Sequence, residues 1–129
     1  MNKIVEALKD VGVFYVATVD GDQPHVRPFA STCEFEGNAY ICTNNQKEVY
    51  KQMMSNNKVE ISGMNKTGEW IRLSATVVRD DRDEVRAAML ADPTGPSDFY
   101  TVGDGIFEVF KLENVSGMKY SFTAEPVAL

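Results

Sequence analysis

The sequence predicts a mainly β protein with short helices, folded as a closed or nearly closed antiparallel barrel of six to seven strands. Runs of β-branched and aromatic residues alternate with short Gly, Asn and Asp turns, which is typical of antiparallel strands. Three stretches with helical spacing of apolar residues are inserted between these runs. An open sheet with this many strands would expose long edges, and closure into a barrel removes them.

The first half of the chain reads as a helix followed by a three-stranded meander. The Asp-Gly-Asp sequence at 20–22 is a strong hairpin signal between two β-rich runs. Pro28 lies within the second run, and because proline cannot donate to a β-ladder it marks an edge, a bulge or a break in pairing. A second turn is expected at 37–38. We therefore expect a helix over 2–10 and strands over 11–19, 23–35 and 39–43.

The second half contains two further helices and the remaining strands. Apolar residues at helical spacing (Val49, Tyr50, Met53 and Met54) predict a helix over 46–55. Asp80 and Asp81 are the expected cap of a third helix. The stretch 92–105 is the longest irregular segment, and a loop of this length is either functional or mobile. Strands are predicted over 59–64, 69–79, 106–112 and 115–122, with the last two joined at 113–114.

Composition restricts the classes of function. The 129 residues suit a single domain over 1–129, without repeats or linkers. The net charge of −6 argues against broad nucleic-acid binding but allows a small phosphorylated ligand in one basic pocket. No apolar run approaches the length of a membrane span, and the N-terminus is unlike a signal peptide. We therefore expect a cytoplasmic protein with no membrane or nucleic-acid partner.

The cysteines and the single histidine show no metal-ligand spacing, so no metal site is expected. If the turn lies at Gly37-Asn38, Cys33 and Cys42 fall opposite each other, and a cross-strand disulfide becomes geometrically possible. A reducing compartment favours two reduced core thiols instead. His25 is interpreted as structural.

One pair of basic residues suggests an anion site. Asn45 with Glu48 three residues later is an N-cap signature, which places Lys47 in the first turn of a helix. A cation there opposes the helix dipole, whereas an anion bound at the free N–H groups would relieve the conflict. Arg27 would reach the same anion if its strand lies beside the Asn44–Asn45 loop. The alternative is two solvated charges on separate surfaces, with Glu48 offsetting Lys47.

Three stretches together resemble a known family. They are FYVATVDGDQPHVRPF at 14–29, CTNNQK at 42–47 and WIRLSA at 70–75. Their order and spacing resemble the pyridoxamine 5′-phosphate oxidase-like family of FMN-binding split β-barrels, over almost the whole chain. Within that family the chain looks closest to the short single-domain members, which include nitroimidazole-reductase-like and general-stress-protein-like proteins.

The resemblance implies a homodimer with one FMN at each of two clefts between the subunits. It implies that Arg27 and Lys47 hold the FMN phosphate, with Gln46 beside Lys47. Trp70 would contact the flavin from the partner subunit, while strand alternation leaves open the face that Arg72 takes. The remaining implied contacts are backbone groups along the flavin at Pro28, Phe29 and Ala30, and phosphate or ribityl contacts from Thr43 and Asn44.

The chain also departs from the true oxidases. The tail after Tyr120 has no His or Arg, although the oxidases use such residues to hold pyridoxal phosphate, so vitamin B6 oxidation is not expected. Gln46 stands where the oxidases tend to have a basic residue, which weakens the charge match to the FMN phosphate.

No nucleophilic or paired-carboxylate motif is present, so no catalytic residue is assigned. That fits flavin chemistry, in which the cofactor carries the electrons and the protein supplies binding and orientation. The residues considered as neighbours of the flavin ring, and interpreted as packing, are Tyr15, His25, Trp70 and Tyr100. The 92–105 loop is either a lid over the ring or a surface crossover.

Three functions are consistent with the sequence. The favoured one is a small FMN-dependent oxidoreductase that reduces a small electron-poor or quinone-like molecule at the expense of a nicotinamide donor. The second is a non-enzymatic FMN-binding protein that carries electrons or senses flavin. The third is a barrel of the same fold that binds haem, a deazaflavin or no cofactor.

Overall fold

Eight strands form one antiparallel sheet, partly covered by three helices, in the computed structural model, which describes residues 2–129. The helices are α1 (Lys3–Val11), α2 (Glu48–Ser55) and α3 (Asp83–Ala91). The strands are β1 (Phe14–Asp20), β2 (Gln23–Phe29), β3 (Thr32–Phe35), β4 (Asn38–Asn44), β5 (Lys58–Met64), β6 (Trp70–Asp80), β7 (Phe107–Tyr120) and β8 (Val127–Ala128). No helix within residues 2–129 combines the length and the apolar character needed to cross a bilayer.

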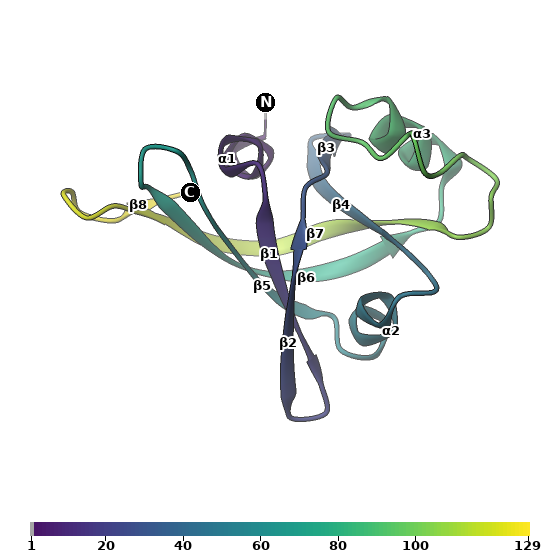
Figure 1. Ribbon diagram of the computed structural model, residues 1–129, viewed down its shortest axis with the longest axis horizontal. Coiled ribbons are helices and arrows are strands. Elements are labelled where there is room, and N and C mark those ends of the chain that lie inside the picture. The colour runs from purple at the N-terminus through teal and green to yellow at the C-terminus, as the bar shows by residue number, and fades with distance from the viewer. Residues whose placement is uncertain (1) are drawn as a thin grey trace.

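The strand order turns this sheet into a split barrel. The order is β2-β1-β5-β6-β7-β4-β3, so the two outermost strands are consecutive in the chain and are joined only by residues 30–31. These two edges do not pair with each other, and the barrel stays open along that seam. Figure 1 shows the β1–β2 hairpin projecting from the body, with α3 at one end of the long β6–β7 ribbon and β8 at the other. The predicted fold class is confirmed.

The predicted second strand, 23–35, is wrong as a single element. It is divided into β2 and β3, and the break comes one residue after Pro28. Pro28 itself lies on the edge strand β2, where its missing N–H costs no ladder bond on the open side. The break allows the chain to leave one edge of the sheet and start the other.

The two strands predicted at the C-terminal end are in fact one. β7 runs through the expected turn at 113–114, and Asn114 adopts φ of 52° there. The register against β6 shifts between Ser74 and Thr76, so the positive φ belongs to an irregularity in a continuous ladder and not to a hairpin. With the split second strand and the added β8, the sheet has eight strands instead of six to seven.

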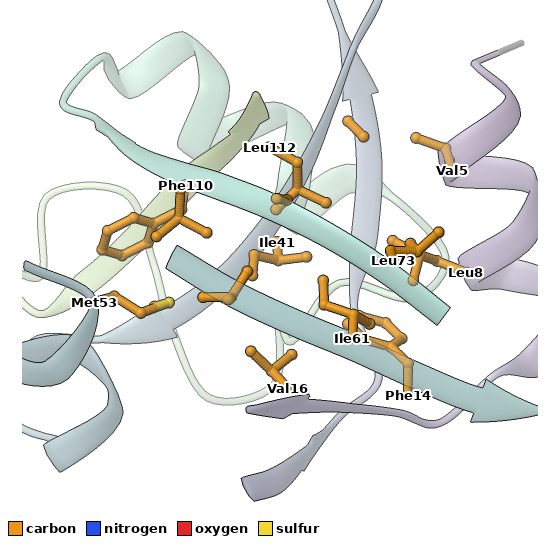
Figure 2. Close-up of a cluster of buried hydrophobic side chains, with 14 of the residues drawn as sticks. Val5, Leu8, Phe14, Val16, Ile41, Met53, Ile61, Leu73, Phe110 and Leu112 are labelled. Carbon is orange, nitrogen blue, oxygen red and sulfur yellow. The ribbon is translucent and has the colours of Figure 1, made fainter. Parts of the chain in front are cut away.

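The core lies inside the curved sheet, where inward residues of the strands meet two helices. Figure 2 shows Val5 and Leu8 of α1 and Met53 of α2 reaching this cluster from opposite sides. Burying a side chain of this kind stabilises the fold by about 1.5–3 kcal/mol. The fully buried members on the strands include Phe14, Val16, Ile41, Ile61, Leu73 and Phe110.

Helix α1 begins and ends where local chemistry requires. The Oδ1 atom of Asn2 accepts hydrogen bonds from the N–H groups of Ile4 at 2.8 Å and Val5 at 3.2 Å. The helix ends at Gly12, whose φ of 76° suits a residue without a Cβ atom. Val5 and Leu8 are buried, as expected from the helical spacing of apolar residues in this stretch.

The turn of the β3–β4 hairpin differs from the expected one, so the two cysteines are not opposite each other. Its turn is formed by Glu36 and Gly37, both at positive φ, so it lies one residue earlier than predicted. Cys33 therefore pairs with Tyr40 and not with Cys42, and both thiols are free. Burial raises the pKa of Cys33 to about 11 and that of Cys42 to about 12, so both thiols stay protonated at neutral pH.

Candidate functional site

A cavity of about 190 Å³ opens at the seam of the barrel, beside the start of α2. Edge strand β2, the end of β4 and the loop that follows α3 form its other walls. Six residues proposed from the sequence as cofactor contacts line it, namely Arg27, Pro28, Phe29, Ala30, Thr43 and Lys47. The other lining residues are Ser31, Cys42, Val49, Pro96 and Tyr100.

Arg27 is held in place by two buried polar side chains. Its Nη1 atom donates to Thr18 Oγ1 at 2.7 Å, and its Nη2 atom donates to Gln52 Oε1 at 2.8 Å. Nη1 also lies 3.2 Å from the carbonyl oxygen of Val16. The guanidinium is thus fixed between β1 and α2, at the wall of the cavity.

The charge at this cavity is unbalanced. Among residues 2–129, no carboxylate forms an ion pair with Arg27 or Lys47. Burial lowers the pKa of Arg27, whereas the hydrogen bonds that Arg82 donates to the carboxylates of Asp80 and Glu36 raise the pKa of Arg82 well above its ordinary value. Two cations in a chain of net charge −6 therefore face one cavity without an internal counter-ion.

The start of α2 differs from the prediction. Lys47, not Asn45, occupies the N-cap position, and no side chain caps the helix. Asn45 instead ties the preceding loop to β7: its Nδ2 donates to Glu108 at 3.2 Å, and its backbone N–H donates to Ile106 O at 2.9 Å. The first N–H groups of α2 therefore have no side-chain acceptor among the described residues, and the anchored loop presents Lys47 to the cavity.

The third helix also lacks the predicted aspartate cap. Arg82 is its N-cap residue, and Asp80 Oδ1 accepts from the Arg82 N–H at 3.2 Å instead of capping the helix.

Glu108 is the centre of a buried ionic cluster next to the cavity. Its carboxylate accepts from Arg86 Nη2 at 2.8 Å and from Arg79 Nε at 3.1 Å, in addition to Asn45. Although burial alone would raise the pKa of Glu108, the hydrogen bonds from Arg86, Arg79 and Asn45 lower it. The cluster joins β6, β7 and α3 to the loop that carries Lys47.

The 92–105 loop is anchored against β3. Thr94 donates to Thr32 O at 3.0 Å and accepts from Ser31 Oγ at 2.6 Å through its carbonyl oxygen. Tyr100 lines the cavity, whereas Phe99 is almost fully exposed. Of these two aromatic residues of the loop, only Tyr100 is therefore placed at the cavity.

Asn44 and Gln46 border the cavity without lining it. Asn44 Oδ1 accepts from the Gln46 N–H at 3.0 Å, and Asn44 Nδ2 donates to the Tyr100 hydroxyl at 2.6 Å. The Gln46 side chain is exposed.

Trp70 and Arg72 lie on a different part of the structure from the Arg27 cavity. Both are on the outer face of the sheet, where the Trp70 ring stacks on Tyr120 with centroids 5.7 Å apart and Arg72 lies over the same tyrosine. A second cavity of about 360 Å³ opens there, lined by Tyr15, Ser62, Gly63, Met64, Trp70 and Phe122. One chain alone therefore does not bring Trp70 to the Arg27 cavity.

Thr18, Gln52 and Tyr100 were not among the site residues assigned from the sequence. Thr18 and Gln52 did carry a signal, because Thr18 continues the inward alternation of Phe14 and Val16, and Gln52 falls within the buried stripe of α2. A polar residue at a position where the periodic pattern places buried apolar side chains indicates a buried hydrogen-bond partner, which here is Arg27.

Comparisons with known proteins agree with this architecture. The sequence profile described as "Pyridoxamine 5′-phosphate oxidase" matches residues 1–102. A NimC/NimA family protein from Clostridium acetobutylicum is 48% identical, with a TM-score of 0.96 over 100% of this chain and 90% of that chain. No curated protein sequence matches this chain.

Two more distant structures share the fold alone. A pyridoxamine 5′-phosphate oxidase-related, FMN binding protein from Nostoc punctiforme is 16% identical, with a TM-score of 0.70 over 96% of this chain and 84% of that chain. A heme binding protein from Mycobacterium smegmatis is 14% identical, with a TM-score of 0.77 over 99% of this chain and 56% of that chain. By its sequence profile and its split barrel, this chain belongs to the pyridoxamine 5′-phosphate oxidase-like family.

Proposed function

We propose that this protein binds FMN, with the phosphate in the Arg27–Lys47 cavity, and acts as a small FMN-dependent oxidoreductase. The observation that carries the proposal is the convergence of two cations without a carboxylate partner on one cavity, among the described residues. A phosphate monoester supplies the missing charge, and arginine and lysine are the side chains that bind it most strongly.

The residues fit the two ends of FMN differently. A cavity of about 190 Å³ has room for the phosphate and part of the ribityl chain, but it is smaller than pockets that enclose whole cofactors, which are on the order of 300–1,000 Å³. The flavin ring would then extend beyond it, past Pro28, Phe29 and Ala30, which line the cavity. This leaves one side of the ring uncovered by the same chain.

A second copy of the chain is the proposed cover. The outer face of the sheet exposes large apolar side chains, of which Phe122 is 82% exposed and Met64 is 53% exposed. Trp70 lies on the same face, beside Phe122. We infer a homodimer in which Trp70 of one subunit approaches the ring bound by the other.

FMN would supply the hydride or electron transfer, and the chain supplies binding, orientation and exclusion of water. The fixed guanidinium of Arg27 offers a planar donor to the phosphate, and Lys47 adds a point charge. The proposed substrates are a nicotinamide donor and a small electron-poor or quinone-like acceptor. An electron carrier that binds FMN without turnover is the alternative.

Haem is less compatible with this cavity. The family fold includes a heme binding protein, but histidine is the axial ligand of globins and peroxidases, and His25 is the single histidine of this chain. His25 is exposed on β2 and does not line the cavity, and the Cys42 thiol has a pKa raised by burial.

Binding of FMN and of riboflavin, followed by quenching of flavin fluorescence, tests the phosphate site. Because the two differ only in the phosphate, their affinity ratio isolates its contribution. Arg27→Ala and Lys47→Ala are each expected to reduce that ratio by about tenfold or more, through lost charge-assisted hydrogen bonds. Lys51→Ala is the control, since Lys51 is an exposed lysine of α2 whose ion pair is with Glu48 on the helix surface. Equal ratios in all three variants and the parent would refute the site.

A complementation experiment tests the shared cleft. Lys47→Ala and Trp70→Ala should each weaken FMN binding when alone. In a mixed dimer one cleft carries both changes and the other carries neither, so mixing the two variants should restore part of the binding. Absence of restoration, or sedimentation of the FMN-loaded protein as a monomer, would overturn the shared site. Oxidation of NAD(P)H by the loaded protein with a nitro compound or quinone separates the enzyme from the carrier.

A further inference from the structure

We infer that the Tyr100 hydroxyl is a third donor to the phosphate, and that Asn44 orients it. This inference rests on the proposed FMN site. The 92–105 loop brings Tyr100 into the same cavity as Arg27 and Lys47, although it follows them by more than fifty positions in the chain.

The direction of the hydroxyl hydrogen follows from one backbone group. The Gln46 N–H donates to the side-chain oxygen of Asn44 at 3.0 Å, which fixes which end of that amide faces the backbone. The amide nitrogen of Asn44 must then face Tyr100, and it donates to the hydroxyl oxygen at 2.6 Å. The Tyr100 oxygen is thus an acceptor toward Asn44, and its own hydrogen has to point elsewhere.

That hydrogen has no acceptor within the part of the chain that the structure describes, residues 2–129. Tyr100 lines the cavity, so an occupant of the cavity is the available acceptor. The neighbouring groups, Arg27 and Lys47, are both donors, so the three together match an acceptor with several oxygens and negative charge.

The hydroxyl is also rigidly placed. The Tyr100 ring stacks on Phe107 with centroids 5.1 Å apart and an interplanar angle of 28°. The start of the same loop is hydrogen-bonded to β3 through Thr94. A fixed donor of this kind costs little conformational entropy when it binds, which favours recognition over simple packing.

Tyr100→Phe tests the assignment because it keeps the ring stack and removes only the hydroxyl. The FMN-to-riboflavin affinity ratio should fall by about tenfold, the effect of one hydrogen bond to a charged group, while riboflavin affinity stays within about twofold of the parent. Tyr40→Phe is the matched control, since the Tyr40 hydroxyl bonds to Asp80 and lies outside the cavity. Its ratio should equal that of the parent.

The outcomes separate this inference from the function on which it rests. A parent protein that does not prefer FMN over riboflavin refutes the phosphate site itself. A parent that prefers FMN, with a Tyr100→Phe variant of unchanged ratio, overturns only the role of Tyr100. Equal losses for FMN and riboflavin also overturn it, because the hydroxyl would then contact the part that both ligands share.

A double-mutant cycle tests the orienting role of Asn44. If Asn44 acts through the hydroxyl, Asn44→Ala lowers the ratio in the parent but has little further effect in the Tyr100→Phe background. Additive losses would show that Asn44 contacts the ligand independently. The phosphorus NMR signal of bound FMN gives a second readout, which should move in Tyr100→Phe and stay in Tyr40→Phe.

Discussion

Removing the carboxylate of Glu108 should destabilise the fold and weaken the site together. Glu108 is 5% exposed in its side chain and faces Arg86, which is 11% exposed, and Arg79, which is 31% exposed. Taking one partner from a buried ion pair costs about 3–5 kcal/mol, because the remaining charges lose their compensation. Arg86 keeps Asp81 at 2.7 Å and Arg79 is partly hydrated, so we expect the lower end, about 3 kcal/mol, for Glu108→Ala.

Urea denaturation at pH 7 measures the loss directly, and a thermal scan should show a fall in Tm of roughly 10–15 °C. Glu113→Ala is the control on the same strand, since the Glu113 side chain is 39% exposed and forms an ion pair with Lys111 at 2.8 Å. An exposed pair of this kind contributes less than about 1 kcal/mol. A Glu108→Ala variant no less stable than Glu113→Ala would refute the reasoning.

The same substitution also tests the connection between the cluster and the cavity. Glu108 accepts from Asn45, whose loop carries Lys47. We therefore expect the folded Glu108→Ala protein to bind FMN more weakly than the parent, whereas Glu113→Ala should bind it normally. Unchanged FMN affinity would show that the backbone bond from Asn45 to Ile106 holds the loop by itself.

Three further predictions concern stability. Ile61 is fully buried, so Ile61→Ala should lower the unfolding free energy by about 3 kcal/mol in urea, and a loss below about 1 kcal/mol would contradict its place in the core. A Cβ atom at Gly95 would lie 2.0 Å from Met89 O, so Gly95→Ala should cost about 2 kcal/mol and lower the Tm; an unchanged Tm would mean that the turn after α3 can shift freely. Hydrogen bonds from Arg82 lower the pKa of Asp80 to about 2, below its ordinary value. The stability that the Asp80 carboxylate contributes is therefore complete above about pH 5 and is lost as the pH falls toward 2. Asp80→Asn should flatten the dependence of the unfolding free energy on pH in that range, and an unaltered dependence would exclude this group.

Local sequence patterns determined much of the fold. The alternation in β1 and β5 and the helical spacing in α1 and α2 predict which residues face inward, because strand and helix periods are properties of the backbone itself. Met54 is an exception, since it belongs to the predicted apolar stripe of α2 but is 53% exposed. The pairing of a basic strand residue with a basic helix start also pointed to Arg27 and Lys47, which the structure brings to one cavity.

Tertiary structure decided the features that depend on non-local pairing. The register of β3 against β4 separates the two cysteines, and a one-residue difference in the turn is enough to do so, because pairing shifts for the whole hairpin. Likewise, pairing with β6 carries β7 through Asn114, where the local sequence favours a turn.

The finer composition of the site also required the fold. Glu108 and Tyr100 act through partners that are distant in the chain, and such contacts leave little signal in the sequence around each residue. By itself the sequence determined which periodic apolar residues form the core, and it singled out Arg27 and Lys47 as the two cations of the site. Only the three-dimensional pairing decided which polar groups fix Arg27 and anchor the loop that carries Lys47, because burial and hydrogen bonding are set by neighbours that the chain brings together only when it folds.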